Sequence, residues 1–361
     1  DFDGDANIDI YIGNGHTSYL AQDQLFMGNG DGTFTAAALP GAGSQPSNGT
    51  VACDYDNDGD QDVFVSVYGV SNGGAQNLMW ENDGAGSFTN VAIERGFASL
   101  ATGNYWLEGT GFGTEIEPDA EPGTYIGSNG FGLECADVNN DGYLDLFATA
   151  ISHPVASDYS RKWSDPTALL INQGPAAGFA FVNRFLEKGL PFNEGDVDGA
   201  VVDFDNDGCL DLSLSRDKKY ESSYADDEQK SWFGLMHQQP DGTFESVGMS
   251  CGVNDPEADF LRMKGAQNHA WSDIDRDGDL DLLVGGRDAG GGRPNFLFEN
   301  VHGSENRWMG FALRGDGVNV NRDAFGARVT LSCAGSLLMR EVKSSRGTYD
   351  SMDMRSLLFG L

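Results

Sequence analysis

The sequence predicts an all-β fold, and three observations support this prediction. A short Asp-rich cassette recurs five times, and an alternating apolar run typical of a β-strand follows each copy. A second segment, made of strand, Gly/Asn/Asp turn and strand, comes after each cassette and predicts a β-hairpin. The cassettes begin 53, 83, 66 and 70 residues apart, with four antiparallel strands expected per repeat. Four-stranded units at such a period predict the blades of a β-propeller.

The clearest cassette is D-I-D-R-D-G-D-L-D, from Asp273 to Asp281. Carboxylates stand at its first, third, fifth and ninth positions, and Gly278 at the sixth allows the positive φ of a tight turn. The seventh position offers a backbone carbonyl. These donors are hard oxygens, and Ca²⁺ takes roughly six to eight of them. The loop begins like an EF-hand but closes with an Asp three residues after the glycine, and a strand follows it.

Five cassettes in one chain predict five metal sites, although a lone Asp-Gly pair also forms ordinary hairpin turns. The first cassette departs from the pattern because Ala6 stands in place of the glycine. We predict about five structural Ca²⁺ ions, held by positions one, three, five, seven and nine of each cassette. The predicted ligands are Asp1, Asp3, Asp5, Asn7, Asp9, Asp54, Asp56, Asp58, Asp60, Asp62, Asp137, Asn139, Asp141, Tyr143, Asp145, Asp203, Asp205, Asp207, Cys209, Asp211, Asp273, Asp275, Asp277, Asp279 and Asp281.

The repeated segments resemble a known family. The D-x-D-x-D-G-x-x-D cassettes and the N-x-L-F-x-N-x-G-x-G-x-F hairpins, such as Gln24 to Phe34, are similar to the FG-GAP/VCBS repeats of integrin-α-type propellers. The C-terminal part resembles the ASPIC/UnbV domain in Asn321 to Val329, in Arg340 to Val342 and in Leu358 to Leu361. The resemblance implies a secreted, Ca²⁺-loaded propeller of the cartilage-acidic-protein type. Members of that type have about seven blades, whereas five are visible in this sequence.

Two domains are predicted, a propeller over residues 1–304 and an incomplete ASPIC/UnbV-like module over residues 305–361. The chain begins inside a cassette and ends inside the last motif of the module. We therefore interpret it as a fragment or a processed product, or else as a ring that a terminal strand closes. The cations Arg328 and Arg340 of the module could form a binding surface, or could pair with acidic neighbours such as Glu341.

Composition limits the partners of the protein. It has 56 acidic and 22 basic residues, a formal charge of −34, and 21 of the acids lie in the cassettes. Nucleic acid is not an expected partner, because affinity for phosphates comes from Lys and Arg. No run of about 18 apolar residues exists, so no segment is expected to span a membrane. Cassettes of this kind would fill at extracellular Ca²⁺ levels, which predicts a secreted or cell-surface protein of unknown oligomeric state.

Five cysteines give no regular framework. Cys53 and Cys135 come just before cassettes on inner strands, where we expect buried thiols. Cys209 and Cys251 fall in one repeat and could pair with each other. The odd number leaves at least one free thiol or an intermolecular bond.

The long loops are expected on the face opposite the cassettes, where binding residues tend to concentrate. Eight of the 22 basic residues fall in three of these loops, and aromatic residues are interleaved with them. We predict a site for an acidic glycan or for a protein partner, in which Arg pairs with carboxylates. The same cations could instead neutralise acidic neighbours such as Asp226. The candidate ligand-binding residues are Trp106, Arg161, Lys162, Trp163, Arg216, Lys218, Tyr220, Arg287 and Arg293.

The predicted function is an extracellular binding or adhesion module stabilised by Ca²⁺. The alternative is a polysaccharide lyase or sugar dehydratase on the same face, with an acid–base set of His16, His153, Tyr159 and Arg161. No H-E-x-x-H motif and no repeated His-ligand spacing occur, so the enzyme is the less favoured interpretation. His269, on the inner strand before the last cassette, is expected to be a hydrogen-bonded core histidine.

Overall fold

The computed structural model describes residues 1–15, 21–41, 43–68, 76–98, 130–151, 167–191, 193, 195–216, 233–254, 266–286, 295–333, 335–347 and 352–361. Within these ranges the chain is all β, with two 3₁₀ turns, η2 (Pro175–Ala177) and η5 (Gly303–Glu305). No helix in the described part of the chain has the length and apolarity needed to cross a membrane.

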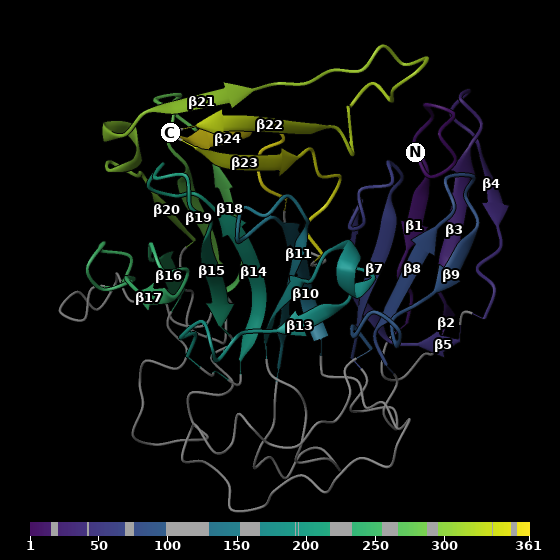
Figure 1. Cartoon of the computed structure of the whole chain (residues 1–361), viewed down its shortest axis with the longest axis horizontal. Coiled ribbons are helices and arrows are strands. Elements are labelled where there is room, and N and C mark those ends of the chain that lie inside the picture. Colours follow the sequence, from purple (N-terminus) through teal and green to yellow (C-terminus); the bar gives the residue numbers. More distant parts are fainter. Residues whose placement is uncertain are drawn as a thin grey trace, which may run out of the picture.

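Five antiparallel sheets follow one another along the chain as blades (Figure 1). The first has β1 (Ile10–Ile12), β3 (Gln24–Gly28) and β4 (Phe34–Ala37), and the second has β6 (Ser47–Cys53), β7 (Asp62–Val67), β8 (Leu78–Asn82) and β9 (Phe88–Asn90). The third has β10 (Gly130–Ala136), β11 (Asp145–Ala150), β12 (Ala168–Asn172) and β13 (Phe181–Asn183). The fourth has β14 (Asp196–Val202), β15 (Asp211–Arg216), β16 (Gly234–Gln238) and β17 (Phe244–Ser246), and the fifth has β18 (Ala266–Ser272), β19 (Asp281–Gly286) and β20 (Phe296–Phe298).

These sheets confirm the predicted β-propeller of four-stranded antiparallel blades, with three complete blades in the described ranges. Each blade pairs its strands antiparallel in chain order. The first and fifth blades each have three strands in the described ranges. A short pair, β2 (Ala21–Gln22) with β5 (Ser44–Gln45), lies beside the first blade.

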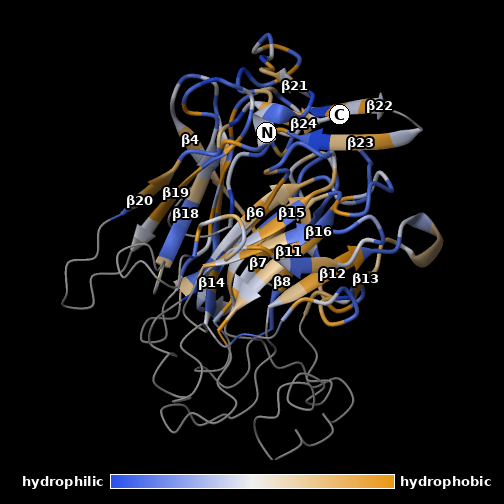
Figure 2. Ribbon diagram, turned by 90° about the vertical axis from the view of Figure 1, so that its left-hand side faces the viewer, coloured by the Kyte–Doolittle hydropathy of each residue, from blue (hydrophilic) through white to orange (hydrophobic). Residues whose placement is uncertain are grey.

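The core lies between the blades. All six residues of β7 and of β15 are buried, because a neighbouring blade covers each face of these second strands. Phe64 of β7 meets Phe97 and, across the blade interface, Phe181 of β13, with ring centroids 5.5 and 5.9 Å away. Edge-to-face contacts of this kind add about 0.5–1.5 kcal/mol to the burial itself. Figure 2 shows the hydrophobic residues concentrated along the blade strands.

A repeated side-chain contact fastens each blade to the one before it. The amide at or just after the end of the third strand donates to the carbonyl of the second cassette residue of the preceding blade. We call these contacts the inter-blade hydrogen bonds. They join Asn82 to Phe2 (2.8 Å), Asn172 to Tyr55 (2.9 Å), Gln238 to Val138 (3.0 Å) and Asn300 to Phe204 (2.6 Å). The repeated Asn of the hairpin motif therefore has a structural role between blades.

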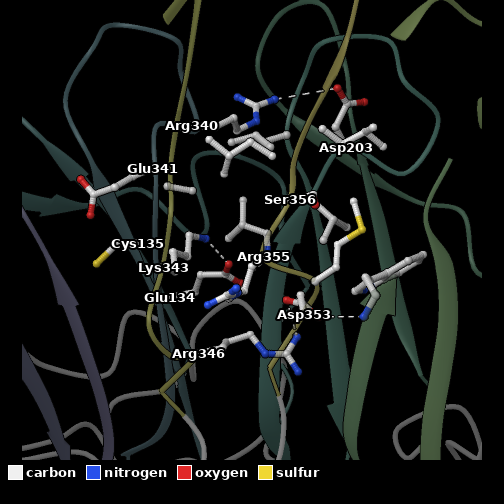
Figure 3. A pocket seen from close by; sticks show the side chains of 18 of the residues that line it. Glu134, Cys135, Asp203, Arg340, Glu341, Lys343, Arg346, Asp353, Arg355 and Ser356 are labelled. Atoms are coloured by element: carbon white, nitrogen blue, oxygen red, sulfur yellow. Dashed lines mark hydrogen bonds and ion pairs between the residues drawn. The ribbon is translucent and has the colours of Figure 1, made fainter. Parts of the chain in front are cut away.

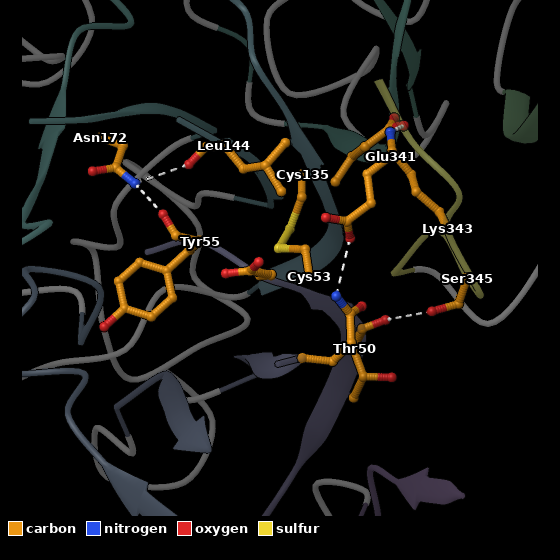
Figure 4. The surroundings of a disulfide bond; sticks show 12 residues. Thr50, Cys53, Tyr55, Cys135, Leu144, Asn172, Glu341, Lys343 and Ser345 are labelled. Atoms are coloured by element: carbon orange, nitrogen blue, oxygen red, sulfur yellow. Dashed lines mark hydrogen bonds and ion pairs between the residues drawn. A yellow bond between two sulfur atoms is a disulfide. The ribbon is translucent and has the colours of Figure 1, made fainter. Parts of the chain in front are cut away.

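A disulfide joins the second and third blades (Figure 4). It links Cys53 at the end of β6 to Cys135 on β10, and both residues are buried. The expectation of two buried thiols was therefore wrong, because the inner strands of adjacent blades lie side by side. Cys209 and Cys251 do not pair with each other, and both remain free together with Cys333.

The C-terminal elements form two further strand pairs. β21 (Trp308–Phe311) pairs with β24 (Leu357–Gly360), and β22 (Arg328–Cys333) pairs with β23 (Ser336–Glu341). These strands lie at the cassette ends of the blades, across the top of the molecule in Figure 1. The boundary near residue 305 remains a prediction.

The segment between β23 and β24 reaches the inner strands of the propeller. Gly347 donates its backbone N–H to Leu133 of β10 at 2.7 Å. Met354 donates to the carbonyl of Trp271 on β18 at 3.1 Å, and the Trp271 backbone N–H donates to the Asp353 carboxylate at 2.7 Å. The C-terminal part of the chain thus connects inner strands of separate blades.

Candidate metal centres

Each cassette joins the first strand of its blade to the second, and all five share one backbone geometry. The fourth and sixth positions have positive φ in every copy. These positions are Gly4 and Ala6, Asn57 and Gly59, Asn140 and Gly142, Asn206 and Gly208, and Arg276 and Gly278. Two residues in the left-handed backbone conformation, with one residue between them, bend the loop tightly enough for alternate side chains to converge. Ala6 takes a φ of 68°, which costs a residue with a Cβ more than it costs glycine.

Backbone amides hold the first carboxylate of the cassette. Asp137 accepts the N–H groups of Asp141 at 3.0 Å and Gly142 at 2.9 Å. In the second cassette Asp54 accepts the amides of Asp58 and Gly59 in the same way. This carboxylate is fixed in place by the loop that it begins.

The ninth carboxylate has a second role that the sequence did not reveal. In every blade its Oδ1 accepts the backbone N–H of a residue at or just after the end of the third strand. The pairs are Asp9 with Gly28, Asp62 with Asn82, Asp145 with Asn172, Asp211 with Gln238 and Asp281 with Asn300. The ninth position therefore ties the cassette to the third strand of its own blade.

Carboxylates converge in four of the five cassettes, where oxygen atoms of three residues lie within 4.8 Å of one another. The groups are Asp1, Asp3 and Asp5; Asp54, Asp56 and Asp58; Asp203, Asp205 and Asp211; and Asp273, Asp275 and Asp277. In the third cassette Asn139 replaces a carboxylate, and its amide donates to Asp141 at 2.9 Å. The structure thus brings together three of the predicted ligands in each of these four cassettes.

Several of these oxygens are buried and make no hydrogen bond within the described residues. They belong to Asp56, Asp60, Asp62, Asp203, Asp205, Asp273 and Asp279. An unsatisfied buried polar group costs about 1–3 kcal/mol, and more when it is charged. Hard oxygen donors that converge without partners fit a hard divalent cation such as Ca²⁺.

The local electrostatics agree with this fit. Burial, with the neighbouring carboxylates adding to it, raises the pKa of Asp60 to about 7 and that of Asp56 to about 6. Burial likewise raises the pKa of Asp62 to about 9. These groups are costly to ionise together, and a bound cation would offset that cost.

Cations of the C-terminal strands reach two cassettes. Arg328 on β22 donates to the Asp54 carbonyl and to Asn57, and its Nη2 lies 3.5 Å from the Asp54 carboxylate. Its Nε pairs with Glu341 at 2.8 Å, which is one of the two alternatives that the sequence left open. Arg340 on β23 lies 3.8 Å from Asp203 of the fourth cassette.

The fifth cassette is covered as well. A methyl group at position 278 would overlap the indole of Trp308, so Gly278 permits β21 to pack directly on the loop. Asn306 donates to the Asp205 carbonyl at 2.8 Å. The C-terminal strands therefore contact the second, fourth and fifth cassettes.

A cavity of about 120 Å³ lies between the inner strands and the C-terminal segment (Figure 3). Much of its charged wall is internally paired. Lys343 pairs with Glu134, and Arg346 lies 3.5 Å from Asp353. Opposite charges that face one another in this way favour packing of the segment against the blades over capture of an ion.

The opposite loop face is described at one predicted residue. Arg216 is buried, and its Nε lies 3.0 Å from the Asp196 carboxylate. The other candidate residues for ligand binding or acid–base chemistry lie outside the described residues. These are Trp106, Arg161, Lys162, Trp163, Lys218, Tyr220, Arg287, Arg293, His16, His153 and Tyr159.

One buried row has the hydrogen-bond order of a nucleophilic triad. His269 contacts Asp198 through Nδ1 at 3.0 Å and Ser213 through Nε2 at 2.7 Å. All three residues are fully buried, and the Ser213 hydroxyl also accepts the indole N–H of Trp271. A nucleophile needs access to substrate, so His269 is a hydrogen-bonded core histidine, as expected.

His237 also lies beside the fourth cassette, and no motif in the sequence marked it as a candidate. This residue lies on β16, with Nε2 3.1 Å from Asp205 and 3.6 Å from Asp207. The available signal was its place directly before Gln238, whose backbone is bonded to the ninth carboxylate. A residue at that place lies beside the cassette.

The blades and their Asp-rich loops define a class, the repeat β-propellers with metal-type cassettes. Comparison with family models finds an FG-GAP-like repeat over residues 1–65 and an "ASPIC and UnbV" domain over residues 317–361. The chain therefore contains both an FG-GAP-like repeat and an ASPIC and UnbV domain, as the resemblance implied. No match was found among curated proteins.

Proposed function

We propose that the protein is an extracellular, Ca²⁺-stabilised β-propeller that acts as a binding module. The observation that carries the metal part is the set of buried carboxylate oxygens without hydrogen bonds in the cassettes. Five divalent ions would offset ten of the 34 net negative charges and neutralise loops that otherwise repel themselves. The residues that would hold the ions are those of the predicted ligand set.

The metal has a structural consequence beyond the loop itself. The second cassette residue lies between two ligands, and its carbonyl accepts the inter-blade hydrogen bond, as Tyr55 does from Asn172 (Figure 4). Ordering the cassette therefore orders the acceptor for the next blade. Metal binding and blade docking are coupled in this proposal, and loss of one weakens the other.

Thermal unfolding with and without EDTA tests the metal part. Each site filled at a hundred times its Kd contributes about 2.7 kcal/mol. We expect EDTA to lower the unfolding midpoint by more than about 10 °C, and Ca²⁺ but not Mg²⁺ to restore it. An unchanged midpoint would show that the cassettes are ordinary Asp-rich turns.

Two features support the extracellular binding part. The Cys53–Cys135 disulfide suits an oxidising compartment. The cassette face is covered by the C-terminal strands at three loops, which leaves the opposite loop face for a partner. The proposed partner is an acidic glycan or a protein surface that carries carboxylates, met by the Arg and Lys residues of those loops.

Screening acidic glycans against the Ca²⁺-loaded protein tests this part and separates it from the enzyme alternative. Saturable binding that weakens with rising salt, without new absorbance in the ultraviolet, supports the binding module. Release of unsaturated, ultraviolet-absorbing products would support a lyase. Absence of binding across the acidic glycans would leave the protein-partner form to be tested by co-purification from Ca²⁺ buffer.

A further inference from the structure

The fourth cassette groups its carboxylates differently from the others. In the first, second and fifth cassettes, positions one, three and five come together. In the fourth, positions one, three and nine come together, as Asp203, Asp205 and Asp211. Position five, Asp207, instead joins Asp205 and His237 in a second group whose donor atoms also lie within 4.8 Å. The two groups share Asp205.

Both groups contain a buried carboxylate oxygen that makes no hydrogen bond within the described residues. Asp203 is 4% exposed, and its Oδ1 makes no hydrogen bond within the described residues. Asp205 Oδ1 is buried and also lacks a hydrogen bond, whereas its Oδ2 lies 3.1 Å from His237. The Asp205 carboxylate can therefore offer one oxygen to each of two neighbouring cation positions.

His237 faces the carboxylates, and its Nε2 forms no hydrogen bond with any residue that the structure describes. That nitrogen lies 3.1 Å from Asp205 Oδ2 and 3.6 Å from Asp207 Oδ2. Zinc–nitrogen and zinc–oxygen bonds of about 2.0–2.2 Å in tetrahedral geometry separate the donors by about 3.3–3.5 Å. The observed distances lie on either side of that range.

The imidazole is held in this orientation by two contacts. Its Nδ1 lies 3.0 Å from the Gln239 amide, and its ring packs edge-on against Phe204 at 5.9 Å. Histidine ligands usually have such a partner on the second ring nitrogen, which fixes the ring and its tautomer. A flip of the Gln239 amide would let its oxygen accept Nδ1–H when Nε2 binds a metal.

The equivalent residue differs in every other blade. The position directly before the amide bonded to the ninth carboxylate is Met27, Glu81, Ile171 and Glu299 in the first, second, third and fifth blades. The fourth blade alone supplies a nitrogen donor there. Ca²⁺ is bound by oxygen, whereas imidazole with carboxylates suits Zn²⁺ and related ions.

We propose that the fourth cassette carries a second cation position that takes a borderline divalent metal of the Zn²⁺ type. Asp205, Asp207 and His237 bind it, beside the hard-cation position of Asp203, Asp205 and Asp211, and the Asp205 carboxylate bridges the two. The side chains of His237 and Asp205 are 24% and 25% exposed, so the fourth coordination position is open to water. This inference goes beyond the Ca²⁺ proposal, since it adds a metal of another type and a nitrogen donor, and it moves Asp207 from the predicted Ca²⁺ ligands to the second position.

Calorimetric titration of the Ca²⁺-saturated full chain with Zn²⁺ tests the proposal. We expect one Zn²⁺ per chain, and an affinity at least about tenfold lower in His237→Gln. Histidine side-chain NMR of the wild-type protein should show the Nε2 signal of one residue move on Zn²⁺ addition. That measurement does not depend on the folding of a variant.

Two matched variants complete the test. His302→Gln removes an exposed imidazole from the fifth blade and should leave Zn²⁺ binding unchanged. Cys333→Ser removes a free thiol from β22 and should also leave the stoichiometry unchanged. Zn²⁺ binding that survives His237→Gln, or is lost in Cys333→Ser, would overturn the proposal, as would its absence in the Ca²⁺-saturated wild type. Thermal response to Ca²⁺ in the same samples reports separately on the hard-cation sites.

Discussion

The second and fourth cassettes have the same framework and different surroundings. In both, the ninth carboxylate accepts a third-strand N–H, from Asn82 in one and from Gln238 in the other. The residue before that amide is Glu81 in the second blade and His237 in the fourth. The carboxylate of Glu81 lies 2.7 Å from the Arg95 guanidinium, whereas the imidazole of His237 faces the cassette carboxylates.

This difference shows that the chemistry of a cassette is decided partly outside it. Arg95 also donates to the Gly178 carbonyl of the next blade at 2.8 Å, so the Glu81 network connects blades. The equivalent position in the fourth blade is free for a metal-directed side chain. If the fourth cassette binds the proposed Zn²⁺-type ion, a repeat can keep its loop and change its metal through one strand residue.

The largest expected effect concerns the disulfide, which lies beside the second cassette and has no counterpart at the fourth. Cys53 immediately precedes Asp54, and its disulfide to Cys135 closes a separation of 82 residues. We expect the Cys53→Ser, Cys135→Ser double variant to lose about 2–5 kcal/mol in urea unfolding. Hydrogen exchange should rise at the second cassette and stay unchanged at the fourth. Equal rises at both would contradict a local anchor.

A pH dependence should distinguish the second cassette from the fourth. Burial raises the pKa of Glu341 to about 7, against the opposing effects of Arg328 and Gln61 and with Asp54 nearby. Since the ordinary value is 4.5, the folded state holds a proton that the unfolded chain releases between these values. Stability from this group is full below about pH 4.5 and is lost as the pH rises to 7.

The Glu341→Gln variant should lose up to about 3 kcal/mol of the change in unfolding free energy that occurs between pH 4.5 and 7. The measurement is the urea midpoint from pH 4.5 to 7.5 in saturating Ca²⁺, with the wild-type and variant curves subtracted. Arg355→Gln, which removes a half-exposed cation of the C-terminal segment, is the control that should leave the slope unchanged. Parallel curves for wild type and Glu341→Gln would contradict the assignment.

The inter-blade hydrogen bonds allow a graded comparison. The Asn82 amide donates to both Phe2 and Gln61, and the Gln238 amide donates to Val138. Each carbonyl left unsatisfied costs about 1–3 kcal/mol. We therefore expect Asn82→Leu to destabilise the chain by about 2–3 kcal/mol and Gln238→Leu by roughly half as much. A larger loss at Gln238 would refute the ranking.

The smallest effect concerns backbone strain. Ala6 has a φ of 68°, whereas Gly59 at the same place in the second cassette has a φ of 99°. Ala6→Gly should stabilise the first cassette by up to about 1 kcal/mol, and Gly59→Ala should destabilise the second by a similar amount. Nothing lies within 4 Å of a Cβ at position 59, so the effect is purely conformational. Thermal midpoints in Ca²⁺ measure both changes.

The sequence was sufficient for the propeller because its cassettes and hairpins are local patterns with a fixed order. It did not show the disulfide, because Cys53 and Cys135 lie in different repeats and meet only when the inner strands align. The one available signal was that both cysteines come just before cassettes. The contact of Arg328 with Asp54 was equally hidden, because it joins residues 274 positions apart.

The inter-blade hydrogen bonds run in one direction, since every donor belongs to the later blade. The carbonyl of Phe2 accepts from an amide that lies 80 residues further along the chain, and the carbonyl of Tyr55 accepts from one that lies 117 residues further. At about 5–20 residues per second, the ribosome adds that length in several seconds or more. In a nascent chain the newest cassette would therefore always have an acceptor carbonyl whose partner is not yet made, and under the Ca²⁺ proposal an ion bound during synthesis would preserve that cassette until the next blade arrives.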